Sequence, residues 1–257
     1  MDPQVVTPEG STHFPGEGHS YLTSIEEASF WFRARNRLII DLLRRYGGNF
    51  RSLLEVGCGT GFVLKGIRAA FPSARLVGVE ALATGLQEAV KRLDHTIELS
   101  QADILRLSYE GEFDVVGAFD VLEHIDDDRA ALSALTRAVL PGGVVLLTVP
   151  QHPWLWSAAD EIAQHRRRYR RGELEEKAST AGLDVVMTTS FVCSLLPAMM
   201  ANRLLGPVRP EDEHVLPRVI GGLFEAILGC ERRLIALRVG LPVGGTRVVV
   251  ARRAGLD

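Results

Sequence analysis

A glycine-rich turn at residues 55–61 (EVGCGTG) follows an apolar run and has the composition of a ligand-binding loop. Glycines let backbone N–H groups come close to a ligand because no Cβ stands in the way. A dinucleotide-binding turn of the form G-x-G-x-x-G would have its third glycine at position 62, where this chain has Phe62. A pyrophosphate also disfavours a nearby carboxylate, whereas a ligand that carries ammonium and sulfonium cations tolerates Glu55. The turn therefore favours a positively charged, nucleotide-like ligand over a dinucleotide.

Acidic residues stand at the ends of the apolar runs that follow this turn. Glu80 ends the second run, and a carboxylate there can accept hydrogen bonds from both ribose hydroxyls of a nucleoside. Asp103 ends the third run, where it can accept from an adenine amino group while Ile104 packs on the ring. An aspartate after a strand is also a common turn or cap residue, so both roles stay open for Asp103. The fourth run ends at Phe119-Asp120.

Three histidines follow strand ends and could act as a base, because an ordinary histidine titrates near neutrality. His124 lies at the mouth of the fourth strand, and its alternative role is to order the loop by bonding the backbone or the acids at 126–128. His152 follows the fifth apolar run beside two tryptophans that either line an acceptor pocket or pack. His165 precedes a run of arginines. His124 and His165 are the candidate catalytic residues.

Arginine-rich stretches lie before the glycine-rich turn and after His165. Residues 166–171 hold five arginines, which either pair with Glu173, Glu175 and Glu176 or form a site for an anion, since arginine binds carboxylate or phosphate with two hydrogen bonds. In the N-terminal part, Arg35 follows an aromatic stripe. If this segment covers the ligand, Arg35 can reach a ligand carboxylate.

The elements that must position these residues alternate between strands and helices. Apolar runs rich in Val and Leu that alternate with helices indicate a parallel sheet covered on both faces. A capping-box pair, Ser24 and Glu27, predicts the start of a helix that ends at Gly47-Gly48. We expect strands at 51–57, 74–80, 97–103, 113–119, 143–150, 183–191 and 247–253, and helices at 61–70, 84–93, 127–139 and 172–181.

Two regions break this alternation, and both are expected to form walls or a lid over the ligand. Residues 151–171 are predicted to be a long loop. Residues 192–245 are predicted to be helices broken by Pro and Gly, and they include an amphipathic helix. One role for that helix is to pack on the edge of the sheet. The alternatives are that it forms a dimer interface, an apolar cover over the substrate or a contact with a membrane surface.

Composition narrows the class of protein. The chain of 257 residues suits one large domain, and 29 Lys and Arg against 32 Asp and Glu give a net charge of −3, so we expect no nucleic-acid partner. Cysteines 58, 193 and 230 have no metal-type spacing, so we expect a reduced cytoplasmic protein and no bound metal. The N-terminus shows no secretory signal, and the uncharged stretch at 185–202 opens as a strand, so we expect no transmembrane helix.

The motifs at 51–150 together resemble the class I S-adenosylmethionine-dependent methyltransferases, through EVGCGTG, GVE, QADI, FDVVGAFDVLEHIDD and LPGGVVLLTVP. The segments FWFRARNRLI and QHPWLW…HRRRYRRGEL resemble a bacterial, small-molecule subgroup of that family. The resemblance implies an α/β fold: a Rossmann-like, doubly wound, seven-stranded sheet, mostly parallel with an antiparallel last strand. It implies S-adenosylmethionine over the glycine turn. The residues expected to bind it are Arg35, Glu55, Gly57, Cys58, Gly59, Gly61, Glu80, Ala81, Asp103, Ile104, Phe119 and Asp120.

A single domain with a mobile tail accommodates these assignments. We expect the tail at 1–20 and the domain at 21–257. Its parts are an N-terminal cap helix at 21–50, the cofactor-binding core at 51–150, an acceptor-side loop, helix and strand at 151–191, a helical lid insertion at 192–245 and the last strand at 246–257.

The expected reaction is methyl transfer to a small-molecule or lipid- or sugar-linked acceptor, anionic or apolar, with oxygen favoured over carbon or nitrogen. One alternative is a regulatory or partner protein that binds S-adenosylmethionine without transfer. Another is an NAD-dependent oxidoreductase, against which Phe62 argues. The oligomeric state stays open between monomer and homodimer.

Overall fold

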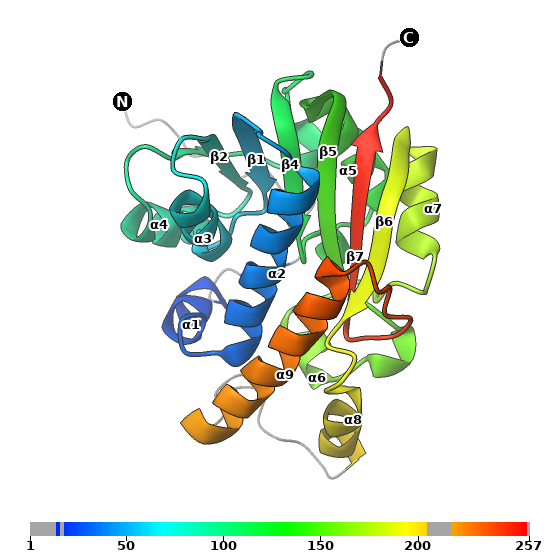
Figure 1. The fold of residues 1–257 in the computed structure, drawn as a ribbon. Helices are drawn as coiled ribbons and strands as arrows, with labels where there is room; N and C mark the ends of the chain where they lie inside the picture. The colour runs from blue at the N-terminus through cyan, green and yellow to red at the C-terminus, as the bar shows by residue number, and fades with distance from the viewer. Residues whose placement is uncertain (1–13, 16–17, 205–216, 256–257) are drawn as a thin grey trace.

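A seven-stranded sheet forms the centre of the protein (Figure 1). The structure is a computed structural model that describes residues 14–15, 18–204 and 217–255. The strand order is β3-β2-β1-β4-β5-β7-β6. The strands are β1 (Ser52–Val56), β2 (Arg75–Glu80), β3 (Glu98–Gln101), β4 (Phe113–Phe119), β5 (Val139–Pro150), β6 (Leu183–Phe191) and β7 (Thr246–Arg253).

Strand direction in this sheet agrees with the expected fold. β7 pairs antiparallel with β5 on one side and with β6 on the other, so the other six strands run parallel and the last strand alone is reversed. The predicted Rossmann-like sheet with an antiparallel last strand is therefore confirmed.

Helices cover both faces of the sheet. Successive residues of β1 point to opposite faces, so Leu53 packs in one apolar core and Leu54 in the other. α2, α3 and α9 cover the face with Leu53, and α5 and α7 cover the face with Leu54. The α-helices are α1 (Gly18–Ile25), α2 (Phe30–Tyr46), α3 (Phe62–Ala70), α4 (Ala83–Arg92), α5 (Asp128–Ala138), α6 (Ala158–Ile162), α7 (Glu173–Thr180), α8 (Leu196–Leu204) and α9 (Arg218–Ala236). Short 3₁₀ turns are η1 (Ile104–Arg106), η2 (Leu122–His124) and η3 (Pro153–Leu155).

The N-terminal region differs from the prediction. It forms two helices, α1 and α2, where one was expected from Ser24 onward, and Ser24 donates its hydroxyl to the carbonyl of Tyr21 within α1 instead of capping a new helix. The predicted mobile tail also extended too far, because residues 18–20 belong to α1 and His19 is buried. The rest of that tail, residues 1–13 and 16–17, lies outside the described residues.

Residues 151–171 are more ordered than a plain loop. They contain η3 and α6, and α6 begins with a reciprocal capping box between Ser157 and Asp160. The predicted helical insertion at 192–245 contains α8 and α9, with residues 205–216 outside the described part. α9 lies beside α2 in front of the sheet (Figure 1), where Arg232 pairs with Asp41 at 2.8 Å. Among the residues that the structure describes, no helix has both the length and the apolar character needed to cross a membrane.

One buried carboxylate joins these outer segments to the core. Asp128, in the first turn of α5, is 3% exposed and accepts hydrogen bonds from Lys177 of α7 and from the hydroxyl of Tyr169, both at 2.7 Å. Arg167 pairs with the same carboxylate at 3.0 Å. Burial raises the pKa of Asp128, but these partners lower it more, so the net pKa lies below the ordinary value.

We expect Asp128→Asn to destabilise the fold by about 3 kcal/mol at neutral pH, because the variant leaves the Lys177 ammonium buried beside a neutral amide. The pKa of Asp128 is lower in the folded state, so this stabilisation is present above the unfolded pKa and is lost as the pH falls through the folded pKa. Urea unfolding across acidic pH measures both effects. Glu176→Gln is the matched control, because Glu176 pairs with Arg129 only at 3.9 Å on the surface. A loss of stability equal to that control would contradict the role given to Asp128.

Candidate active site

A cavity of about 570 Å³ lies beside the ends of the parallel strands, the usual place for ligands in such sheets. It brings together most of the predicted site residues from six different parts of the chain. The predicted residues in its lining are Arg35, Glu55, Gly57, Cys58, Gly59, Glu80, Ala81, Ile104, Phe119, Asp120, His124 and His165. Gly61 and Asp103 stand next to the lining but are not part of it.

The glycine turn closes one side of the cavity. Gly57 has a φ of +72°, and a Cβ there would lie 2.4 Å from Cγ2 of Val121, so only glycine fits. The amides of Gly57 and Cys58 both donate to the carbonyl of Val79, which fixes the turn onto the neighbouring strand β2. Gly61 precedes α3 as its N-cap, also at positive φ, and positions that helix.

Glu80 and Asp103 each hold backbone amides. The Glu80 carboxylate accepts from the amides of Gly59 and Leu82, both at 2.9 Å, so it orders the glycine turn while lining the cavity. Asp103 accepts from the amide of Leu105 at 2.9 Å and caps η1. The cap role left open for Asp103 is thus present in the structure, and its role toward adenine stays a prediction.

Glu55 and Cys58 are both buried at the floor of the cavity. Burial raises the pKa of the Glu55 carboxyl well above its ordinary value, against the opposing charge of Arg35. Its Oε2 atom has no hydrogen-bond partner among the described residues. Burial likewise raises the pKa of the Cys58 thiol, so Cys58 is a packing residue of the turn and a poor nucleophile.

Arg35 reaches the cavity from α2. Its guanidinium pairs with Asp120 and lies 4.6 Å from the ring centre of Trp31. Asp120 has a φ of +57°, and Thr148 of β5 donates a hydrogen bond of 3.0 Å to its other carboxylate oxygen. The Nε atom of Arg35 is buried and has no hydrogen-bond partner among the residues that the structure describes. Arg35 therefore brings a positive charge to the cavity lining.

The two candidate catalytic histidines meet on the other side of the cavity. The rings of His124 and His165 lie 4.8 Å apart in an edge-to-face arrangement. Asp160 of α6 lies 2.8 Å from Nδ1 of His165, and hydrogen bonding to His165 and Arg168 outweighs burial and lowers the pKa of Asp160 to about 2. Beside them, the Glu123 carboxylate is fully buried, and burial and the charge of Asp120 raise its pKa well above the ordinary value.

Two further sequence predictions are corrected by the geometry. His152, stacked on Trp154 at 5.2 Å between ring centres, is not in the cavity lining. The arginine run does not take Glu173, Glu175 and Glu176 as its side-chain partners. Arg166, Arg167 and Arg168 pair with Asp126, Asp128 and Asp160, respectively. The reason is that the run folds back along the loop after β4, where the amide of Arg166 donates to the carbonyl of Glu123.

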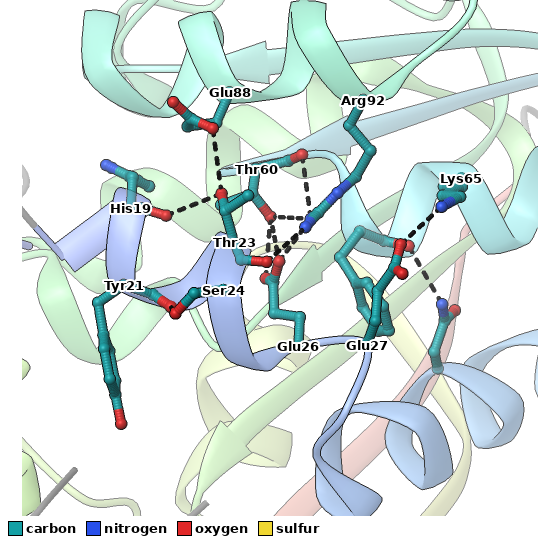
Figure 2. A network of polar contacts seen from close by, with 12 residues as sticks. His19, Tyr21, Thr23, Ser24, Glu26, Glu27, Thr60, Lys65, Glu88 and Arg92 are labelled. Carbon is teal, nitrogen blue, oxygen red and sulfur yellow. Dashed lines mark hydrogen bonds and ion pairs between the residues drawn. The ribbon is translucent and has the colours of Figure 1, made fainter. Parts of the chain in front are cut away.

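A polar network fastens α1 across the glycine turn (Figure 2). Thr60 donates to the Glu26 carboxylate at 2.7 Å to Oε2, and Arg92 of α4 pairs with the same carboxylate. The side chains of Arg92 and Glu26 are only 8% and 6% exposed. His19 of α1 lies 3.1 Å through Nδ1 from Oγ1 of Thr84 and lines the cavity. The segment before the main sheet therefore forms a wall of the ligand site.

Sequence reasoning did not select four of these residues: His19, Glu26, Glu123 and Asp160. Glu123 had a readable signal, because it directly precedes His124 at a strand end. Asp160 stands five residues before His165 and could have been paired with it. His19 and Glu26 fall in a segment without strand-end features, and only the folded chain shows their partners.

Comparison with known proteins places the chain in a family. Residues 31–188, more than half of the chain, match the family described as Methyltransferase domain. The chain belongs to this family. The resemblance to the class I S-adenosylmethionine-dependent methyltransferases, which rested on the strand-end motifs, is thereby confirmed.

Individual relatives of this methyltransferase differ in what they are named for. A probable S-adenosylmethionine-dependent methyltransferase of Mycolicibacterium smegmatis is 29% identical over 66% of this chain and 66% of that protein. A ubiquinone biosynthesis O-methyltransferase of Alkalilimnicola ehrlichii is 34% identical over 46% of this chain and 50% of that protein. The chain thus matches between half and about two thirds of the length of these two curated relatives. Among solved structures, Haemonchus contortus phosphoethanolamine N-methyltransferase 2 in complex with S-adenosyl-L-methionine has a TM-score of 0.59 at 20% identity, covering 85% of this chain and 52% of that chain, which shows a shared fold.

Proposed function

We propose that this methyltransferase moves a methyl group from S-adenosylmethionine to a hydroxyl oxygen of a small acceptor. The observation that carries the proposal is a single cavity that joins the glycine turn and Glu80 on one side to His124 and His165 on the other. When bound, S-adenosylmethionine supplies a methyl group on a positively charged sulfur. The chain has to orient that group toward the acceptor and to exclude water.

The residues around the glycine turn fit this cofactor. Glu80 lies at the end of β2, within the lining, where its carboxylate can accept hydrogen bonds from ribose hydroxyls. The buried Glu55 carboxyl has one oxygen without a partner among the described residues, so it retains hydrogen-bonding capacity beside the glycine turn. Arg35 lines the cavity, and its positive charge suits the carboxylate of the amino-acid part. Ile104 and Phe119 offer apolar surface for the adenine ring.

The acceptor side of the cavity combines polar and apolar walls. His124 and His165 are the groups that handle the acceptor oxygen. Helices α8 and α9 contribute apolar side chains to the same cavity, such as Met199 and Phe224. This combination suits a hydroxyl-bearing molecule with a substantial apolar part. The relative named as a ubiquinone biosynthesis O-methyltransferase supports oxygen as the methylated atom.

Calorimetry and a transfer assay together test this function. We expect S-adenosylmethionine and S-adenosylhomocysteine to bind, and NAD to bind much more weakly, because position 62 is Phe in place of glycine and Glu55 adjoins the turn. We expect radiolabelled methyl to pass from S-adenosylmethionine to at least one member of a panel of phenols and apolar alcohols. Cofactor binding with no transfer to any of them would favour a regulatory binding protein, and preference for NAD would contradict the proposal.

A further inference from the structure

One buried carboxylate in the cavity wall lacks the partner that its neighbours have. Asp120 pairs with Arg35, and Asp160 pairs with Arg168 at 2.7 Å. The charges of Asp120, Arg35 and Arg168 act on Glu123. Yet neither of its carboxylate oxygens has a hydrogen-bond partner among the described residues, although the residue is 0% exposed. A buried carboxylate without a hydrogen bond is unfavourable by several kcal/mol, so such a group either takes up a proton or faces something that compensates it.

Two histidines stand at this carboxylate. Glu123, His124 and His165 each offer one ligand atom, and these three atoms all lie within 4.8 Å of one another. Two ligand atoms bound to one cation at about 2.0–2.2 Å in a tetrahedral arrangement are separated by about 3.3–3.6 Å. Side-chain rotations that shorten these separations by about 1 Å therefore bring all three atoms to a common ion.

His165 already has the orientation of a metal ligand. Its Nδ1 atom lies 2.8 Å from the Asp160 carboxylate, which leaves Nε2 as the nitrogen with a lone pair for the cavity. Histidines that bind metals almost always donate their other ring N–H to a carboxylate or a carbonyl, which fixes the tautomer and makes the ligand nitrogen more basic. Asp160 is itself held by Arg168 and by the amide of Ser157 at 2.8 Å, so this support is rigid.

We propose that Glu123, His124 and His165 bind a divalent first-row transition cation at the acceptor side of the cavity. The sequence led us to expect no metal, because that expectation considered only cysteine spacing. Two imidazoles and one carboxylate suit Mn²⁺, Co²⁺ or Zn²⁺ better than Mg²⁺, which prefers an all-oxygen shell. Asp120 stays outside the ligand set, because Arg35 and Thr148 hold its two oxygens.

The site has a use in the reaction, and this part of the inference rests on the proposed function. All three ligands line the cavity, so a cation held by them would be within reach of an acceptor bound there. A hydroxyl group of the acceptor that binds there loses its proton to water more readily. The oxygen then forms a bond to the methyl carbon, while the carbon–sulfur bond breaks and its electron pair stays on sulfur.

Metal binding can be measured without any methyl transfer. The full-length chain without a histidine tag is stripped with chelator and titrated with Co²⁺, and its visible absorption bands report the ligands. We expect one Co²⁺ per chain, with Mg²⁺ a poor competitor. Glu123→Gln, which is isosteric, is expected to abolish the bands. Asp160→Asn is expected to weaken affinity by about 10–100-fold, the usual effect of losing a carboxylate behind a ligating histidine. His95→Ala is the control, because His95 is exposed and outside the cluster.

The outcomes separate this inference from the proposed function. Loss of the Co²⁺ bands in Glu123→Gln but not in His95→Ala, with circular dichroism unchanged, supports the site. Equal Co²⁺ binding by wild type and Glu123→Gln, or no binding by wild type, overturns it. S-adenosylmethionine affinity is measured on the same samples with and without Co²⁺. Tight cofactor binding by a wild-type chain that takes up no metal would overturn the metal site and leave the methyltransferase proposal standing.

Discussion

Replacement of His124 by alanine is expected to slow methyl transfer in a single turnover by about 10²–10⁴-fold, the usual weight of help with the proton of the reacting hydroxyl. His124 gives this help either as a base or as a ligand of the proposed cation. His124 lines the acceptor side of the cavity and is 6% exposed, at the end of the loop that follows β4. The affinity for S-adenosylhomocysteine is expected to stay within about twofold, because the predicted cofactor contacts come from other elements. Rapid-quench kinetics and calorimetry measure these two quantities separately.

His152→Ala is the matched control for this variant, since His152 also follows a strand but is not in the cavity lining. Its transfer rate is expected to equal that of the wild type. Two other results for His124→Ala would assign the residue a different role. If cofactor affinity and melting temperature fall together in His124→Ala, the residue orders the loop after β4. Transfer at a near-normal rate would remove it from the reaction and leave orientation of the acceptor as the main catalytic device.

The centre of the sheet could be predicted from the sequence because its inner strands are buried from both sides. Such strands read as continuous apolar runs, and one of them, Phe113–Phe119, has the predicted bounds. The edge strand Leu183–Phe191 also has the predicted bounds, although its first residues alternate between buried or half-buried and exposed. β5 begins earlier than predicted, at Val139, because Val139 already pairs with Phe113 ahead of the Pro-Gly-Gly turn. The hydrophobic pattern therefore predicts which part of a strand is buried, but it does not predict at which residue the pairing with a neighbouring strand begins.

The N-terminal helices show that a local sequence pattern carries no information about contacts between distant residues. Ser24 and Glu27 have the spacing of a capping box, yet the chain leaves α1 at Ile25 and begins α2 only at Phe30. The cause is distant in the sequence, because Glu26 is held by Thr60 in the glycine turn and by Arg92 of α4. A local signal was overridden by a buried tertiary contact.

The two sides of the cavity were predictable to different degrees for a similar reason. The cofactor side includes the last residues of strands, so strand positions alone bring Glu55, Glu80 and Phe119 to one edge. The acceptor side depends on how the segment after β5 folds back. Only the folded chain brings His165, with Asp160 at its Nδ1 atom, beside Glu123. The same fold gives Arg166, Arg167 and Arg168 aspartate partners in place of the glutamates that the sequence offered as one alternative.

Replacement of Glu80 by alanine is expected to weaken S-adenosylhomocysteine binding by about 1.5–3 kcal/mol, the weight of hydrogen bonds to a charged group. That loss corresponds to about 10–150-fold in dissociation constant. Calorimetry measures it, with Glu98→Ala as the control. Glu98 pairs with Arg75 on exposed β3, at a distance of 2.7 Å, and is not in the cavity lining.

The difficulty with Glu80→Ala is that Glu80 also holds the amides of Gly59 and Leu82, so affinity could fall because the turn loosens. An analogue of S-adenosylhomocysteine without its 2′-hydroxyl separates the two causes. If Glu80 contacts the ribose, the analogue binds the wild type less tightly than the parent ligand does, and the difference between wild type and variant shrinks. If Glu80 acts only through the turn, that difference is the same for both ligands, and the assignment of Glu80 to the ribose is wrong.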